Sequence, residues 1–193
     1  MDRTKLHTYI QSLIPMSSDK VNLVTEQFKP IEITKNELLL KENNVSKDTH
    51  FLEKGFVRSY TFNADGQEVT TNIFSAPCFV NDPLSFFKQQ PTTENYQALT
   101  HCVLWRISYD DVQIKFHSIP EFREFGRMML ITNFSALKER MLGMVKDTAE
   151  TRYLKLMQKH TDIFQNVSLK IIASYLGITD SSLSRIRKEI MKK

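Results

Sequence analysis

Residues 31–108 constrain the fold most, because they contain several short β-type segments and no long helix between them. Short strands joined by turns pair in antiparallel order and bury their apolar sides by forming a sandwich or a barrel. The clearest turn is Asn63-Ala64-Asp65-Gly66. Residues 79–95 interrupt the pattern and predict a short helical turn with a loop. The predicted strands are Ile31–Ile33, Glu37–Lys41, Phe56–Phe62, Glu68–Phe74 and Tyr96–Ile107.

Helical patterns lie on both sides of this β-rich region. Residues 2–28 predict two short helices that Pro15 divides, and Ser17 or Ser18 is placed to begin the second one. Helix returns at Tyr109. The chain is therefore expected to be an α+β protein in which helices flank an antiparallel β-roll.

One predicted helix is longer than a small domain needs. After Pro120, the stretch from Glu121 to about Lys146 contains no proline, and as a helix it would reach about 40 Å. Apolar residues recur along it at three- and four-residue steps, which is typical of a contact within the chain or of a seam with a second copy. We favour the seam, because a small barrel offers so long a helix too little surface. The expected seam residues are Phe122, Phe125, Met129, Phe134, Leu137 and Met141.

Residues 168–188 carry the most specific motif of the chain. A helix-turn-helix needs a small residue where its two helices cross, and Ala173 supplies one. The first helix must end on a residue that accepts a positive φ, which suits Gly177, and Thr179 is then a good N-cap for the second helix. An ordinary helical hairpin is the alternative. Before the motif, a helix is expected over residues 149–160 and a loop over residues 161–167.

The second helix of this motif has two different faces. At 100° per residue, the apolar residues Leu183, Ile186 and Ile190 share one side. The opposite side is small, polar and basic, which suits entry into the major groove of DNA. The charge balance also favours an anionic partner here, because residues 147–193 contain nine basic and five acidic residues while the rest of the chain is neutral overall.

These features give the chain a resemblance to a known family. The segment RYLKLMQKHTDIFQNVSLKIIASYLGITDSSLSRIRKEI resembles the DNA-binding region of the Crp/Fnr family of bacterial transcription regulators, especially its short members from Bacteroidetes. The pieces EKGFVRSY, NADGQEV and LWRISYDDV are similar to the β-roll of that family. The resemblance covers nearly the whole chain. It implies a cyclic-nucleotide-binding-like β-roll (a double-stranded β-helix) in residues 1–118, a long dimerisation helix in residues 119–146 and an all-α helix-turn-helix domain in residues 147–193, without a C-terminal wing.

The resemblance also implies which residues contact DNA. Arg185 occupies the place of the family's guanine-reading arginine, whose fork can bond both major-groove acceptors of a guanine. Asp180 and Ser181 occupy two earlier base-facing places, where the family often has other residues, so a different target sequence is expected. Lys170, Ser182 and Arg187 are expected to contact phosphates. The whole predicted surface consists of Lys170, Thr179, Asp180, Ser181, Ser182, Ser184, Arg185, Arg187 and Lys188.

The chain departs from the family's ligand pattern. Cyclic-nucleotide binders of the family hold the ribose with a Gly-Glu pair and the phosphate with an Arg-Ser or Arg-Thr pair. The matching effector positions here are Asn81, Asp82, Thr92 and Thr93, so the arginine is replaced and Asp82 adds a negative charge. Since a buried phosphate needs a guanidinium, tight binding of cyclic AMP is not expected. The β-roll is expected to bind another effector or to serve only as a dimer scaffold.

Other chemistries have little support in the sequence. The two cysteines, Cys78 and Cys102, exclude a four-cysteine metal site and suggest reduced thiols in the cytoplasm. The five histidines lack the close spacing of metal ligands, and no apolar run approaches the roughly 20 residues of a membrane span. The N-terminus shows no secretory leader. No catalytic residue, metal site or cofactor is therefore predicted.

The expected function is sequence-specific regulation of transcription by a homodimer on palindromic double-stranded DNA, not catalysis. Two alternatives stay open. One is a fully competent cyclic-nucleotide-responsive regulator. The other is a barrel of a different class, either a small-molecule-binding protein or a cupin-like enzyme, whose C-terminal helices only pack. RNA polymerase and an unidentified small-molecule effector are further candidate partners, and no contact with a membrane is expected.

Overall fold

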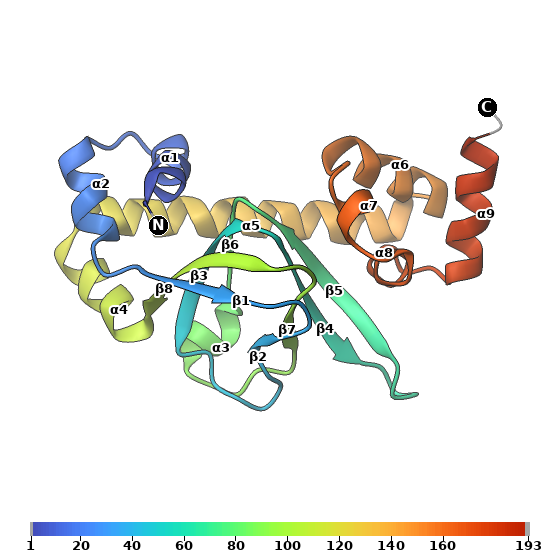
Figure 1. The fold of residues 1–193 in the computed structure, drawn as a ribbon, viewed down its shortest axis with the longest axis horizontal. Coiled ribbons are helices and arrows are strands. Elements are labelled where there is room, and N and C mark those ends of the chain that lie inside the picture. Colours follow the sequence, from blue (N-terminus) through green and yellow to red (C-terminus); the bar gives the residue numbers. More distant parts are fainter. Residues whose placement is uncertain (1, 192–193) are drawn as a thin grey trace.

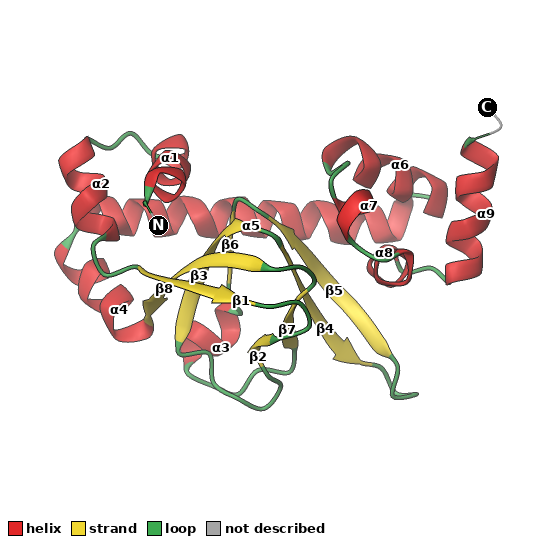
Figure 2. Cartoon of the chain, viewed as in Figure 1, coloured by secondary structure: helices red, strands yellow, loops and turns green. Residues whose placement is uncertain are grey.

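The structure is a computed structural model, and it describes residues 2–191. These residues form an antiparallel β-roll flanked by helices, which confirms the predicted α+β class (Figure 2). The helices are α1 (Thr4–Leu13), α2 (Ser18–Thr25), α3 (Pro83–Lys88), α4 (Tyr109–Ser118), α5 (Pro120–Lys146), α6 (Ala149–Lys159), α7 (Ile163–Asn166), α8 (Leu169–Leu176) and α9 (Asp180–Ile190). The strands are β1 (Lys29–Ile33), β2 (Leu38–Leu40), β3 (Asp48–Lys54), β4 (Phe56–Phe62), β5 (Glu68–Ser75), β6 (Cys78–Val80), β7 (Asn95–Ala98) and β8 (Cys102–Ser108).

Helix α5 organises the arrangement of these parts. It runs along one side of the molecule, with α1 and α2 near its start and α6 to α9 near its end, while the β-roll lies between the two groups (Figure 1). Pro120 stands in the first turn of α5, where its missing N–H leaves no helical hydrogen bond unmade. The long helix therefore links the two ends of the chain directly.

The β-roll consists of two four-stranded sheets, with strand orders β1-β8-β3-β6 and β2-β7-β4-β5. All the pairs of strands are antiparallel. Because side chains alternate along a strand, β3 and β8 of the first sheet bury residues on both of their faces. Leu52, Val80 and Leu104 pack together between the sheets. Phe51 and Trp105 point the other way, into a core shared with α1 and α5.

The observed elements differ from the predicted ones in three places. Strands β3 and β6 were not predicted. Strand β3 is covered on both faces, so its sequence shows no polar–apolar alternation. The single strand predicted over Tyr96–Ile107 is two strands, β7 and β8, which belong to different sheets. Residues 161–167 were predicted as a loop, but α7 forms one helical turn there.

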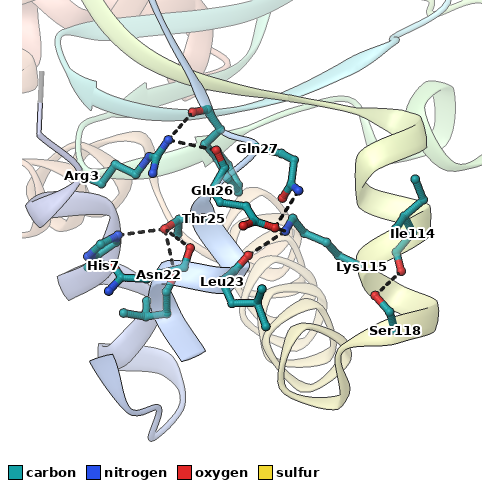
Figure 3. Close-up of polar contacts among 12 residues, drawn as sticks. Arg3, His7, Asn22, Leu23, Thr25, Glu26, Gln27, Ile114, Lys115 and Ser118 are labelled. Atoms are coloured by element: carbon teal, nitrogen blue, oxygen red, sulfur yellow. Dashed lines mark hydrogen bonds and ion pairs between the residues drawn. The ribbon is translucent and has the colours of Figure 1, made fainter. Parts of the chain in front are cut away.

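The N-terminal helices are fixed by a buried cation as well as by apolar contacts. The ammonium group of Lys115, on α4, is nearly enclosed and donates to the carbonyl of Leu23 at 2.8 Å (Figure 3). The carboxylate of Glu26 lies 3.7 Å from it. Burial lowers the pKa of Lys115, and the charge of Glu26 acts in the opposite direction. These contacts hold the end of α2 against α4, next to the beginning of α5.

The C-terminal helices are held against the β-roll by strand β5. The amide of Thr70 donates to Ser174 Oγ on α8 at 2.8 Å. The hydroxyl of Ser75 donates to the carboxylate of Asp162, which precedes α7. Ile73 shares an apolar cluster with the buried residues of α6, α8 and α9. The β-roll and the C-terminal helices therefore meet over a mixed polar and apolar contact.

Two glycines with positive φ offer a matched test of this fold. Gly55, between β3 and β4, has a φ of +104°, and a Cβ atom there would lie 2.7 Å from the carbonyl oxygen of His101. Gly66 has a φ of +74° and open space around it. We expect Gly66→Ala to lower the free energy of unfolding by about 1 kcal/mol, through backbone strain alone. Gly55→Ala should lower it by roughly 3 kcal/mol, since a backbone clash is added to the strain.

Urea unfolding followed by circular dichroism would measure both losses. Equal losses in the two variants would contradict the tight packing around Gly55.

Candidate nucleic-acid interface

The turn between α8 and α9 has the predicted geometry. Gly177 ends α8 in the left-handed conformation, with φ +66° and ψ +37°. The amide of Ile178 donates to the carbonyl of Ala173 at 3.0 Å, which closes the end of α8. Thr179 is the N-cap of α9, and its hydroxyl accepts from the amide of Ser182 at 3.2 Å. The roles predicted for Gly177 and Thr179 from their spacing are therefore confirmed.

Apolar residues lock the two helices together. Ala173 has no exposed surface, so α9 can approach the backbone of α8 closely at that point. Ile172 and Leu183 are fully enclosed, and Leu176 and Ile186 are buried beside them. Burying side chains of this size stabilises the pair by about 1.5–3 kcal/mol each. One side of α9 is thus buried in the core of the helix-turn-helix.

The other side of α9 is free. The helix stands at the outer end of the molecule, away from the β-roll (Figure 1). Within residues 2–191, the guanidinium of Arg185 has no ion pair or hydrogen bond. Ser182 and Arg187 are half-buried, and the other residues of the predicted surface are exposed: Lys170, Thr179, Asp180, Ser181, Ser184, Arg185 and Lys188. The face offers hydroxyl groups and cations, which are the groups that contact DNA bases and phosphates.

Two arginines fix the direction in which α8 and α9 point. Arg140, on α5, donates to the carbonyl of Tyr175 at 3.1 Å, and its guanidinium lies 4.4 Å from the centre of that ring. Arg152, on α6, donates to the carbonyl of Leu176 at 3.1 Å. Both carbonyls belong to the last turn of α8, where helical partners are lacking and positive charge is favourable. The orientation of α8 is therefore tied to α5.

The predicted seam on α5 is wrong in its first half. Phe122 and Phe125 are 4% exposed and belong to the chain's own core, together with α1 and β3. Met129 is packed against the same core, and its sulfur accepts from the hydroxyl of Tyr9 at 3.7 Å. The reason is that these three residues lie about 120° around the helix from Phe134, Leu137 and Met141. The sequence shows one stripe, but the helix has two apolar faces.

The second face of α5 is exposed to solvent. Phe134, Leu137 and Met141 are 66%, 62% and 57% exposed. Leu130 and Val145 continue the same side of the helix, so apolar residues recur there at steps of three and four. We refer to Leu130, Phe134, Leu137, Met141 and Val145 as the α5 stripe. An exposed apolar row of this length marks an interaction surface.

The structure brings three of the four predicted effector positions together, Asn81, Asp82 and Thr92, and leaves Thr93 apart from them. The carboxylate of Asp82 caps α3 by accepting from the amides of Leu84 and Ser85, and it also accepts from the hydroxyl of Thr92 at 2.6 Å. Thr92 is buried by this contact. Asn81 and Asp82 line a cavity in the β-roll, whereas Thr93 is exposed outside it. Asp82 is thus engaged in holding α3, which leaves it unsuited to bind a sugar hydroxyl.

The cavity has a volume of 660 Å³, and it contains two polar residues that the sequence analysis missed. His50, on β3, and Arg106, on β8, are directly opposite each other in the sheet register. Burial, together with the charge of Arg106, lowers the pKa of His50 to about 3, so its imidazole is neutral. Alternation along β3 would have placed His50 on the inner face beside Leu52, but β3 itself was not predicted.

The described residues contain no cluster of three or more His, Cys, Asp or Glu side chains that could hold a metal ion. In the part of the chain that the structure covers, no helix has the length and apolar character of a membrane span.

Comparison with known proteins confirms the resemblance stated from the sequence. Residues 30–117 match the family described as "Cyclic nucleotide-binding domain". The "Anaerobic regulatory protein" of Aggregatibacter actinomycetemcomitans is 22% identical over 185 residues, which are 90% of this chain and 70% of that protein. The "Fumarate and nitrate reduction regulatory protein" of Yersinia pestis is also 22% identical, over 90% of this chain and 72% of its own length. These relatives are regulatory proteins, in agreement with the prediction of a regulator that is not an enzyme.

Solved structures share the fold over most of the chain. The c-di-GMP-responsive global regulator CLP of Xanthomonas campestris has a TM-score of 0.72 and 13% identity, covering 91% of this chain and 92% of its own. A transcriptional regulator of the Crp/Fnr family from Eubacterium rectale has a TM-score of 0.68 and 14% identity, covering 93% and 88%. The likeness therefore includes the long helix and the C-terminal helices as well as the β-roll.

The N-cap of α9 gives a test of the local structure. Thr179→Ala removes the hydroxyl that accepts from the Ser182 amide, so the free energy of unfolding should fall by about 1 kcal/mol. Thr179→Ser keeps a hydroxyl at the same place, and its free energy of unfolding should fall much less. Urea unfolding of the two variants measures the difference, and equal stability of the alanine and serine variants would contradict the capping role.

Proposed function

We propose that this chain, a protein of the Crp/Fnr type whose residues 30–117 match the cyclic nucleotide-binding domain family, is a cytoplasmic transcription regulator that binds DNA as a homodimer. One observation carries the proposal most. Helix α9 is locked to α8 by Leu183 and Ile186, while its opposite face is polar, basic and mostly exposed. A recognition helix in the major groove needs this combination.

The residues of the free face divide into two roles. Arg185 reads a guanine, since its fork matches the N7 and O6 acceptors of that base. Asp180 and Ser181 stand at the start of α9 and face neighbouring bases, where a carboxylate can accept from the amino group of a cytosine. Lys170, Ser182 and Arg187 contact phosphates and set the position of the protein on the duplex. Thr179, Ser184 and Lys188 complete the contact surface.

The α5 stripe is covered by the α5 helix of a second copy. Two identical stripes related by a two-fold axis bury each other, and apolar steps of three and four residues suit such packing. The two α9 helices then enter successive major grooves about 34 Å apart, so the target is a palindrome. A dimer bound to such a site would be placed to contact RNA polymerase.

An effector in the β-roll would act on the orientation of α8 and α9. Strand β5 and helix α5 both hold α8, through Thr70 and Arg140. A ligand that binds one arrangement of these contacts better than another shifts the protein towards that arrangement. Cyclic AMP is not the effector we propose, because Thr92 replaces the phosphate-binding arginine and Asp82 is bound to Thr92.

Breaking the α5 stripe should separate the two copies. Phe134→Glu places a charge in the middle of the seam, and the variant should be a monomer at micromolar concentration, where the wild-type protein is a dimer. Light scattering measures the mass. Ser135→Glu is the matched control, because it adds the same charge about 100° around the helix and should leave the dimer intact. A monomeric wild-type protein, or a dimeric Phe134→Glu variant, would overturn the proposed seam.

Selection from a random pool of double-stranded DNA tests the DNA contacts. At about 150 mM salt, where non-specific phosphate contacts alone are weak, the wild-type protein should enrich a palindrome. Arg185→Ala should bind that site with an affinity lower by a factor of about 5–150, corresponding to about 1–3 kcal/mol, and should relax the preference for guanine.

Two further variants separate the roles of the cations. Arg187→Ala should weaken binding to all sequences alike and reduce the salt slope by about 1. Lys54→Ala removes an exposed charge of the β-roll that is not part of the predicted DNA-binding surface, and this variant should bind as the wild type does. If Arg185→Ala enriches the same palindrome with unchanged affinity, α9 does not read DNA as proposed.

A further inference from the structure

The β-roll cavity combines an apolar wall with a polar end, where the side chains of His50 and Arg106 form no hydrogen bond within residues 2–191. We propose that this cavity binds a small amphiphilic anion, a molecule with an apolar body and one anionic head, and that His50 and Arg106 hold the head. This proposal rests on the proposed function only in assigning the ligand a regulatory role, because the binding site stands on its own geometry.

His50 is the first reason to expect a ligand. The residue is 8% exposed and lines the cavity from strand β3. Within residues 2–191, its ring nitrogens make no hydrogen bond to the protein, although the ring is enclosed. The ring nitrogens keep some contact with the space of the cavity, so a ligand that enters it can form hydrogen bonds with them. Because its ring is neutral, it offers one N–H donor and one acceptor to whatever occupies the cavity.

Arg106 is the second reason, because it brings a positive charge to the same place. It faces His50 across the β3–β8 pair, and paired residues on one face of a sheet have adjacent side chains. Its nearest carboxylate is that of Asp48, 3.9 Å away, which is too far for a hydrogen bond. The guanidinium therefore keeps donors for a ligand, and a carboxylate or sulfonate can accept from Arg106 and His50 together.

The other charges around the cavity agree with an anion. Lys41 and Lys47 lie exposed along its rim, so three cations line it. The two acids of the lining are Asp48 and Asp82, and the latter is engaged by α3 and Thr92. Burial is the main cause of the lowered pKa of His50 and the charge of Arg106 is the second, and an anionic head placed between the two side chains would offset that charge.

The remaining wall is apolar, and this defines the body of the ligand. Ile31, Leu40, Val80 and Tyr96 line the cavity from four different strands. A cavity of 660 Å³ is large enough for a molecule of two fused rings or a medium-length chain. A nucleotide fits this lining less well, because its ribose needs a free acceptor and Asp82 is already bound.

Two matched dyes test the proposal directly on the full-length protein. The dye 8-anilinonaphthalene-1-sulfonate carries a sulfonate, and N-phenyl-1-naphthylamine has the same rings without it. Both fluoresce strongly in an apolar cavity. We expect the sulfonate to bind one molecule per chain, at least about tenfold more tightly than the neutral dye, since only the sulfonate can bond Arg106 and His50.

Variants locate the binding site and the head group. Arg106→Gln and His50→Leu should each lower the affinity for the sulfonate dye, the former by about tenfold. The affinity of both variants for the neutral dye should stay within about twofold of the wild-type value. Lys54→Gln removes a charge from β3 outside the cavity and should leave the affinity for both dyes unchanged. Leu40→Trp places a bulky ring on the apolar wall of the cavity and should weaken binding of both dyes. The thermal midpoint of each variant shows whether it folds, and the half-exposed Arg106 is the substitution least able to disturb the core.

Three results would overturn the proposal. The first is unchanged binding of the sulfonate dye by folded Arg106→Gln protein. The second is unchanged affinity of the Leu40→Trp variant for both dyes, which would place them elsewhere, for example on the α5 stripe. The third is displacement of the sulfonate dye by cyclic AMP at lower concentration than by octanoate.

The DNA selection described above separates this proposal from the proposed function. If Arg106→Gln no longer binds the dye but the wild type enriches no DNA, the proposed anion site is supported and the proposed role in DNA binding is contradicted. The opposite pair of results would leave a DNA-binding protein whose β-roll takes no amphiphilic anion.

Discussion

The burial of Phe122 and Phe125 beneath α1 and β3 is the contact on which the rest of this molecule depends. It fixes the direction in which α5 leaves the β-roll, and the helix then carries that direction to the C-terminal helices. At the far end, Arg140 binds the last turn of α8, so the position of α9 follows from the packing of two phenylalanines. The same burial turns the second apolar face of α5 outwards and leaves the α5 stripe exposed.

This arrangement gives the β-roll two ways to influence α9. One runs through α5, which contacts the first sheet through the shared core and contacts α8 through Arg140. The other runs through β5, which belongs to the second sheet and bonds Ser174 directly. The cavity lies between strands of both sheets, because β3 and β8 supply its polar end while β2 and β7 supply much of its apolar wall. A ligand that changes the spacing of the sheets would therefore bias both contacts, and packed interfaces of this kind respond by switching arrangement.

A part of this structure could be predicted from the sequence when it is formed by interactions between residues close together in the chain, and could not when it depends on residues far apart. The helix-turn-helix was predicted residue by residue, because Ala173, Gly177 and Thr179 obey local rules of packing, backbone conformation and capping. The class of the β-roll was predicted from its many short strands, but β3 was missed because burial on both faces removes alternation. The stripe on α5 was predicted as one surface, since the sequence does not show that the β-roll covers only the first half of the helix. His50 and Arg106 meet through the pairing of β3 with β8, a long-range register that no local pattern contains.

The difference between Asp82 and His50 shows how such a fold can change its ligand without changing its architecture. The sequence resemblance assigns sugar and phosphate binding to the positions of Asp82 and Thr92, yet here their side chains bond each other and the carboxylate of Asp82 caps α3. Asp82 therefore has a structural role in this chain. The polar side chains that we propose as the ligand-binding groups lie instead on β3 and β8, where the hydrogen bonds of the sheet hold the backbone in place. Because the apolar wall and the connection to α5 are independent of those two side chains, their substitution alters what the cavity recognises and leaves intact the contacts that orient α9.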